Sequence, residues 1–249
     1  MRQAEGSPLS GIRGGEENVE IRVLELLEGA KKARGLTVVI DVFRAFTLEC
    51  YLFAQGAKAI YPIGSVDEAR ALKAAHPDWV CFGERGGWQV EGFDYGNSPS
   101  QVAGVDLTGR TCIHTTSAGT QGIVNATGAD EIVTGSLANA RAVATYIRRR
   151  DPREVSIVAM GTSGTQSAGE DVLCARYIEA LLKGTAKGFD VAGKAAALRD
   201  TAGAKFFDPK QPQYPAADFP YCVDCDRFDF VIRVGKDANG RLVNTRLDL

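Results

Sequence analysis

The chain has 249 residues, long enough to bury its own hydrophobic core, so a small scaffold stapled by disulfides is excluded. Apolar residues make up 45% and charged residues 24%, which is typical of a folded globular protein and excludes a disordered one. The 29 Lys and Arg nearly balance the 31 Asp and Glu, so the summed field offers no general attraction for nucleic acid or an anionic membrane.

Strands alternate with helices along most of the chain. Residues 1–18 are polar and glycine-rich and are expected to form a flexible extension. A short alternation at 20–24 favours a first strand, with a helix as the alternative. The further predicted strands are 36–40, 59–63, 80–82, 112–113, 131–134 and 155–160, and the predicted helices are a stretch ending at Gly56, 66–75 capped by Ser65, a stretch ending at Gly128, 137–149 and 170–182. Such connections are crossovers, so we predict an α/β protein with three layers, α/β/α, and a mainly parallel or mixed sheet.

The C-terminal part is less regular. We expect a helix over 195–205, a turn-rich stretch over 209–220, and a terminal hairpin whose strands are 228–234 and 242–245. The hairpin is expected to cover a sheet edge or to contact another subunit. A homodimer is the default expectation for a soluble enzyme.

Two segments of this pattern are similar in sequence. Residues 56–71 align with residues 128–142 if one position is skipped near Pro62, and eight of the 15 paired positions are identical. We infer a single domain over 19–249 that contains two related βαβαβ units, at about 36–84 and 110–162, with a chance match of Ala- and Gly-rich helices as the alternative. Ligands of such sheets bind beyond the carboxyl ends of the strands, so we expect a site between the units.

The cysteines and histidines narrow the chemistry. Cys222 and Cys225 form a CxxC pair without a second pair, so we interpret them as structural, with a redox role as the alternative. His76 precedes a proline in an apparent loop, and His114 lies in a strand-like run where a single structural hydrogen bond is the simpler role. Base chemistry is therefore expected from carboxylates, a metal or both. The other four cysteines lie in apolar segments, which agrees with a cytoplasmic protein, as do the missing membrane span and signal peptide.

The first unit carries acids beside arginines. Asp41 and Arg44 follow one strand, and Glu84 and Arg85 follow another among glycines. This combination suits a metal and a phosphate together, and a purely structural ion pair or a charged surface turn is the alternative. The loop over 83–104 is longer than a passive connector, although ordinary turn chemistry explains its polar residues nearly as well. Those residues are Asp94, Asn97 and Ser98.

The second unit carries hydroxyls where the first carries charges. Its candidate anion pocket consists of Thr115, Thr116, Ser117, Gly119 and Thr120, where backbone N–H groups at a helix start would face an anion. Glu170 and Asp171 follow a later strand, and helix capping without a ligand is the alternative at both places. Walker and GxGxxG loops are missing, which disfavours nucleoside triphosphates and nicotinamide dinucleotides. The inventory suits Mg²⁺ held by one or two carboxylates and phosphate oxygens, with arginines on the remaining negative charge.

Five short sequence blocks, in this order and at this spacing, carry a resemblance to a known family. They are VVIDVFRA (38–45), GERGGWQVEGFDYGNSP (83–99), TTSAGT (115–120), TGSLANARAVA (134–144) and GEDVLCA (169–175). In these blocks the chain resembles the 2-phosphosulfolactate phosphatases of coenzyme M biosynthesis. The resemblance implies a magnesium-dependent hydrolysis of (2R)-2-phospho-3-sulfolactate to 3-sulfolactate and phosphate, and it adds Ser136 and Asn139 to the substrate-binding candidates. Phe46 and Ala118 depart from the family pattern, so the resemblance supports the phosphatase class better than the substrate.

The resulting hypothesis is attack by water on a phosphoester bridged by magnesium. Some of Asp41, Glu84 and Asp94, with Glu170 and Asp171 as further candidates, would hold the metal, and Asp41 as nucleophile is the alternative. Arg44 and Arg85 would bind the phosphoryl and sulfonate groups, and the amides near 117–120 would hold one anionic end. A phosphatase for another small carboxylated phosphoester, or a binding protein for such an acid without turnover, remains open.

Overall fold

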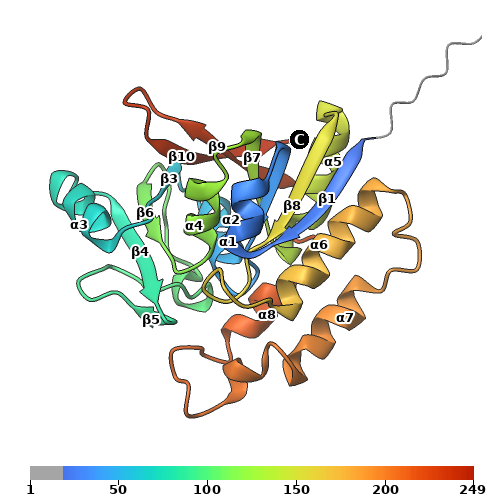
Figure 1. The fold of residues 1–249 in the computed structure, drawn as a ribbon. Coiled ribbons are helices and arrows are strands. Elements are labelled where there is room, and N and C mark those ends of the chain that lie inside the picture. The colour runs from blue at the N-terminus through green and yellow to red at the C-terminus, as the bar shows by residue number, and fades with distance from the viewer. Residues whose placement is uncertain (1–18) are drawn as a thin grey trace, which may run out of the picture.

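The computed structural model describes residues 19–249 (Figure 1), so the extension expected over 1–18 lies outside the described residues. The strands are β1 (Glu20–Glu25), β2 (Gly35–Ile40), β3 (Ala59–Pro62), β4 (Val80–Arg85), β5 (Trp88–Gln89), β6 (Thr111–Thr115), β7 (Ala129–Gly135), β8 (Glu154–Ala159), β9 (Phe230–Lys236) and β10 (Leu242–Asp248). The helices are α1 (Leu26–Lys32), α2 (Ala45–Ala54), α3 (Val66–Ala75), α4 (Gly119–Asn125), α5 (Ala140–Arg150), α6 (Gly169–Leu182), α7 (Val191–Ala197) and α8 (Asp218–Val223).

The described strands form one mixed sheet in the order β1-β8-β2-β7-β9-β10-β3-β6-β4-β5, with helices on both faces (Figure 1). This confirms the predicted three-layer α/β/α fold. The strands β1, β8, β2 and β7 pair in parallel, as do β3, β6 and β4. Between the two parallel blocks, every pairing of β9 and β10 is antiparallel. The two blocks therefore run in opposite directions.

The two predicted repeat units exchange their first strands. The strand β2 belongs to the first unit but lies between β7 and β8 of the second. Conversely, β6 begins the second unit but lies between β3 and β4 of the first. Because of this exchange, α2 and α4 both cross from one block to the other, and they contact each other. The exchange brings the residues that follow β2 next to those that follow β6.

The C-terminal hairpin lies in the middle of the sheet, between the two parallel blocks. Its strand β9 pairs with β7, and β10 pairs with β3 through Asn244 and Ile60. Each repeat unit presents an open edge strand toward the other, and the hairpin closes this gap with backbone hydrogen bonds. The hairpin therefore covers an edge strand of each parallel block.

The core follows the alternation of each strand. Val38 and Ile40 of β2 pack against α5 and α6, whereas Val39 packs on the opposite face with residues of α1, α2 and α4. In the other block, Cys112 of β6 packs toward α2 and Ile113 toward α3. Successive strand side chains point to opposite faces, so apolar runs without polar alternation require helices on both sides.

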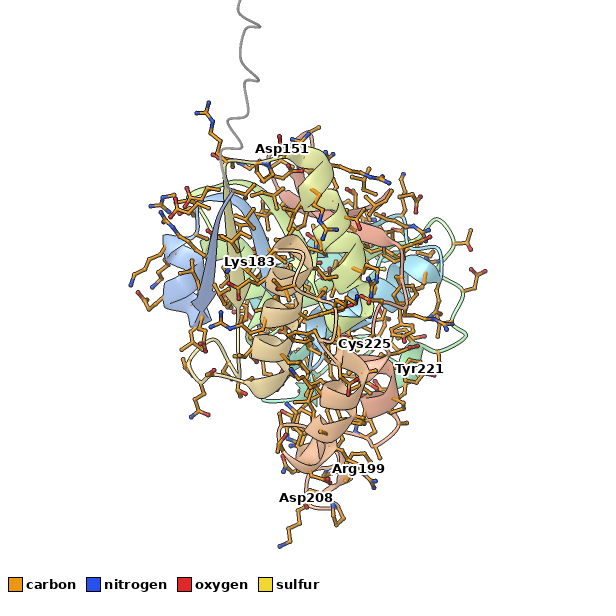
Figure 2. All side chains as sticks on the ribbon, turned by 90° about the vertical axis from the view of Figure 1, so that its right-hand side faces the viewer. Asp151, Lys183, Arg199, Asp208, Tyr221 and Cys225 are labelled. Carbon is orange, nitrogen blue, oxygen red and sulfur yellow. The ribbon has the colours of Figure 1, made fainter. Side chains whose placement is uncertain are left out.

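A long segment of short helices and turns, residues 183–229, separates α6 from β9 and is called the C-terminal excursion. The predicted helix over 195–205 is wrong in its bounds, because α7 ends at Ala197 and two 3₁₀ turns follow, at 198–200 and 204–207. The excursion then runs through a proline-rich stretch into α8. Figure 2 shows Arg199 and Asp208 together at the end of the molecule opposite Asp151. Among residues 19–249, no helix has the length and apolar character to cross a membrane.

Candidate active site

A pocket lies where β2, β4, β6 and β8 are followed by their loops. Carboxylates and cations dominate its lining, together with loop backbone. The lining residues are Asp41, Phe43, Arg44, Glu84, Gly86, Gly87, Asn97, Ser117, Ala118, Gly161, Thr162, Ser163, Glu170, Asp171, Lys205 and Tyr214. Both predicted repeat units and the C-terminal excursion therefore contribute to one site.

Asp41 joins the starts of two helices. It follows β2, and its Oδ1 accepts a hydrogen bond from the Ala45 amide at 3.1 Å, in the first turn of α2. Its Oδ2 accepts a hydrogen bond from the Gly119 amide at 2.9 Å, at the first residue of α4. Burial raises the pKa of Asp41 to about 6 against the effect of the amide bonds, and the negative charges of Glu84 and Glu170 add to the rise.

Asp171 bonds to the backbone just beyond two neighbouring strands, β2 and β8. Its Oδ1 accepts from the amide of Val42, directly beyond β2, and its Oδ2 accepts from the amide of Gly161, just after β8, both at 2.8 Å. Burial raises the pKa of Asp171 well above its usual range, and the charges of Asp41 and Glu170 add to the effect. Each oxygen of this carboxylate therefore already holds a backbone amide.

Glu84 is the third carboxylate whose two oxygens accept from backbone amides of different segments. Its Oε1 accepts from the Ser117 amide, and its Oε2 accepts from the Gly87 amide, both at 2.7 Å. Gly87 has a φ of +85°, and a Cβ atom there would lie 2.5 Å from the Tyr214 ring. Only glycine suits this turn, because a side chain would be strained and would collide with that ring.

Glu170 differs from the other three acids. It lies in the first turn of α6 with 3% of its surface exposed, and its Oε2 has no hydrogen-bond partner among the described residues. Its Oε1 is 3.9 Å from the Lys205 ammonium. Burial raises the pKa of Glu170, partly offset by Lys205. A buried carboxylate oxygen without a partner is costly, so this atom marks a place for a cation or a bound donor.

Arg44 is neutralised by an acid that the sequence pattern did not identify. Its Nη1 donates to Asp218 Oδ2 at 2.7 Å, and both side chains are almost fully buried, at 2% and 0% exposed. The other oxygen of Asp218 accepts from the Ser98 and Ser100 hydroxyls and from the Ser100 amide. Arg44 also lies over the Tyr214 ring, 4.9 Å from its centroid. The partner of Arg44 is therefore Asp218 in α8, and not Asp41.

Lys205 and Tyr214 also line the pocket, and sequence reasoning missed both. They lie on the excursion between α7 and α8, where turns and prolines give no strand or helix pattern. The ammonium of Lys205 lies 5.0 Å from the Tyr214 ring centroid and 5.4 Å from that of Phe43. The sequence signal that could have identified this part of the site is weak: Lys205, Tyr214 and Asp218 lie among aromatic residues in a turn-rich segment.

The predicted anion pocket beyond β6 is largely occupied by the protein itself. The amides of Ser117 and Gly119 bind Glu84 and Asp41. Thr116 and Thr120 bond to each other's amides through their hydroxyls. Thr115 accepts from Arg85 at 2.8 Å, so Arg85 turns toward β6 and does not line the pocket. These residues shape the loop, and their amides are not free for a ligand.

Three more predicted residues lie away from the pocket. Asn139 accepts from the Ser136 amide at 2.9 Å, in a reciprocal capping box before α5. Asp94 accepts from the Cys81 amide and pairs with Lys73 at 2.9 Å. Ser136 and Asn139 thus cap a helix, and Asp94 fixes its own loop. Of the other candidates, Ser98 binds Asp218, whereas Asn97 lines the pocket.

The structure places the two candidate histidine and cysteine groups away from the pocket lining. His114 is fully buried and contacts Glu49 and Asn97. Cys222 and Cys225 are free thiols, and burial raises the pKa of both. In the part of the chain that the structure describes, no three His, Cys, Asp or Glu side chains are grouped so as to hold a metal ion by themselves. Any metal would therefore need ligands from outside the protein.

The family model and the similar proteins that match this chain all carry the same family description. Residues 22–237 match the family model described as 2-phosphosulpholactate phosphatase. A Bacillus subtilis (strain 168) protein named probable 2-phosphosulfolactate phosphatase is 35% identical over 209 residues, covering 82% of this chain and 88% of the relative. A Carboxydothermus hydrogenoformans protein of the same name is 39% identical over 165 residues, covering 66% of this chain and 68% of the relative. A Caldanaerobacter subterraneus protein of the same name is 30% identical, covering 78% and 85%.

Proposed function

This chain belongs to the 2-phosphosulpholactate phosphatase family, and we propose that it hydrolyses 2-phospho-3-sulfolactate to 3-sulfolactate and phosphate with the help of Mg²⁺. Family membership makes it a phosphoric monoester hydrolase. One observation supports the finer proposal: four buried carboxylates share a pocket with Arg44 and Lys205. The substrate carries a phosphate, a sulfonate and a carboxylate, so its charge must be balanced inside that pocket.

The charge balance of the pocket favours a bound cation. Four acids against two bases leave an excess of negative charge, and Arg44 is already paired with Asp218. A trianionic or tetra-anionic ester next to these acids would be repelled without a further positive charge. Mg²⁺ supplies such a charge, and it prefers hard oxygen ligands of which only one or two are carboxylates.

The residues present fit magnesium in one specific way. Glu170 offers a buried oxygen without a partner in the described chain. This carboxylate would hold the ion, and phosphate and water oxygens would supply its other ligands, which agrees with the lack of a protein-only metal cluster among residues 19–249. When bound, magnesium would neutralise phosphoryl charge and polarise the phosphorus centre.

The chain's own residues then have separate tasks. Asp41 would take the proton of the attacking water, because its raised pKa, about 6, suits a base working near neutral pH. Arg44 would bind phosphoryl oxygens, with its guanidinium held in place by Asp218 and Tyr214. Glu84 and Asp171 would keep the surrounding loops at fixed positions through their paired amides.

Lys205 would bind the acid group farthest from the phosphate. Its ammonium lines the pocket, and its nearest acid, Glu170, is 3.9 Å away, outside hydrogen-bond distance. A sulfonate or carboxylate of the substrate would therefore find a donor there that no protein group fully uses. Phe43 and Tyr214 beside it would exclude water from this end of the pocket.

A substrate panel tests the proposal. Phosphate release is measured with magnesium from 2-phospho-3-sulfolactate, 2-phospholactate and 3-phosphoglycerate. We expect the highest kcat/KM with 2-phospho-3-sulfolactate, since it alone carries a sulfonate. A higher kcat/KM with another ester would leave the assignment of the active site unchanged but would assign a different substrate. No release from any ester would contradict the assignment of phosphatase activity.

A further inference from the structure

We propose that a buried polar chain (Asn244, Glu49, His114 and Asn97) sets the orientation of Asn97, so that its amide N–H group points into the pocket and binds an anionic oxygen of the substrate. The inference rests on the proposed function for the identity of that substrate. Asn97 is the binding residue, and the other three are positioning residues.

The chain consists of three consecutive contacts. Asn244 Nδ2 donates to Glu49 Oε2 at 2.8 Å. Glu49 Oε1 lies 2.9 Å from His114 Nδ1, and His114 Nε2 lies 3.3 Å from Asn97 Oδ1. Asn244, Glu49 and His114 are fully buried, and Asn97 is 6% exposed. The contacts thus lead from the central hairpin through α2 and β6 to the pocket lining.

Glu49 holds the His114 ring in place. Its Oε1 lies 2.9 Å from Nδ1 of His114, and its Oε2 accepts from Asn244 Nδ2 at 2.8 Å. Within residues 19–249, His114 is the one basic group within ion-pair distance of Glu49. With Nδ1 next to Glu49, the ring turns Nε2 toward Asn97.

His114 in turn fixes Asn97. The Asn97 atom that faces Nε2 is the amide oxygen, which is only able to accept, so Nε2 is the donor of this contact. The amide nitrogen is then left on the other side, and it donates to no group of the described chain. Because Asn97 lines the pocket together with Arg44 and Ser117, this nitrogen is available to an anionic ligand. A His114 ring without a proton on Nε2 would instead accept from Asn97, reverse the amide and present an oxygen, which repels an anion.

Steady-state kinetics and a double-mutant cycle test this arrangement. We expect Glu49→Gln and Asn97→Ala each to raise KM for 2-phospho-3-sulfolactate at least tenfold with a smaller change in kcat, because a ground-state contact is lost. In the Asn97→Ala background, Glu49→Gln should change KM less than twofold, since it acts through Asn97. Multiplying effects would contradict the proposal.

Two further variants keep the test independent of folding defects. Asn97→Asp retains an acceptor for His114 but places a carboxylate oxygen in the pocket, so KM should rise at least as much as in Asn97→Ala; an unchanged KM would contradict the proposal. Ser156→Ala removes another buried hydrogen bond, to the Arg34 backbone near the start of β2. It is expected to lower the Tm without raising KM.

Nitrogen-15 NMR of the imidazole rings reports directly which ring nitrogens of His114 carry a proton, without a measurement of catalysis. The chain has only two histidines, so a His76→Gln variant assigns the signals of His114. We expect a protonated Nε2 in the wild type. An Nε2 without a proton would overturn the inference, whereas a lack of phosphate release with a protonated Nε2 would remove only the proposed function.

Discussion

The Asp41 carboxylate and the Gly119 amide lie 2.9 Å apart, although the strands that precede them belong to different repeat units. The exchange of β2 and β6 between the units makes this contact possible. Asp41 thereby joins the starts of α2 and α4, the two helices that cross between the parallel blocks. The site is built where the two predicted repeat units meet.

Ionisation of Asp41 should destabilise the metal-free protein. Its pKa is about 6 in the folded chain, against 3.8 for an unperturbed group. Between these pH values the folded state binds more protons than the unfolded state, so this contribution to stability is complete below pH 4 and is lost as the pH rises through 6. The shift corresponds to about 3 kcal/mol.

Urea unfolding in EDTA measures this effect. The free energy of unfolding of Asp41→Asn, minus that of the wild type, should increase between pH 4 and pH 7. Asp130→Asn, which alters an exposed carboxyl, should give a constant difference. A constant difference for Asp41→Asn as well would show that Asp41 does not titrate in this range.

Glu170 should be required for magnesium to stabilise the protein. Saturating Mg²⁺ at about 100 times its Kd would add about 2.7 kcal/mol, a rise in Tm of several degrees. Glu170→Gln should lose this rise, because it removes the charge of the carboxylate with the free oxygen. Glu179→Gln is the matched control on the outer side of α6, where Glu179 pairs with Arg176 and Lys183, and it should keep the rise. An equal rise in both variants would place the ion elsewhere.

Breaking the buried ion pair between Arg44 and Asp218 should cost far more stability than breaking a surface pair. Asp218→Asn leaves a guanidinium that is 2% exposed without its counter-charge, and we expect a loss of about 3 kcal/mol or more. The exposed pair of Arg176 and Glu179 is worth less than about 1 kcal/mol, so Glu179→Gln is again the comparison. Similar losses in chemical denaturation would show that the buried pair is not an anchor.

Removing the charge of Lys205 should affect substrates according to their acid groups. Lys205→Met is expected to raise KM for 2-phospho-3-sulfolactate about tenfold or more, and to affect 2-phospholactate, which lacks the sulfonate, much less. Lys210→Met, on an exposed turn of the same excursion, should leave both values unchanged. An equal rise for the two esters would assign Lys205 to the phosphate or the carboxylate.

The fold was largely predictable because its regular elements carry strong local signals. The apolar run that ends at Asp41 and the helix capped by Ser65 are both present, and the Ser65 hydroxyl accepts from the Glu68 amide. Strand order was not predictable, since local patterns do not state which strands pair. For this reason the exchange of β2 and β6 and the central place of the hairpin had to come from the structure.

The site was predictable only in part. Acids at strand ends, such as Asp41 and Glu84, were identified because carboxyl ends of strands gather ligands. Lys205 and Asp218 come from an irregular excursion that tertiary packing alone brings to the pocket. The hydroxyl-rich run at the end of β6 predicts an anion pocket, but the amides and hydroxyls of Thr116 and Thr120 bind each other instead.

The most direct test measures phosphate release from 2-phospho-3-sulfolactate by the wild type and by Asp41→Asn, each with Mg²⁺ and with EDTA. We predict release by the wild type with Mg²⁺, none with EDTA, and a kcat about 100-fold or more lower in the variant, as expected for the loss of a general base. Undiminished release in EDTA, or a variant as fast as the wild type, would contradict the assignment of this pocket as a magnesium-dependent phosphatase site.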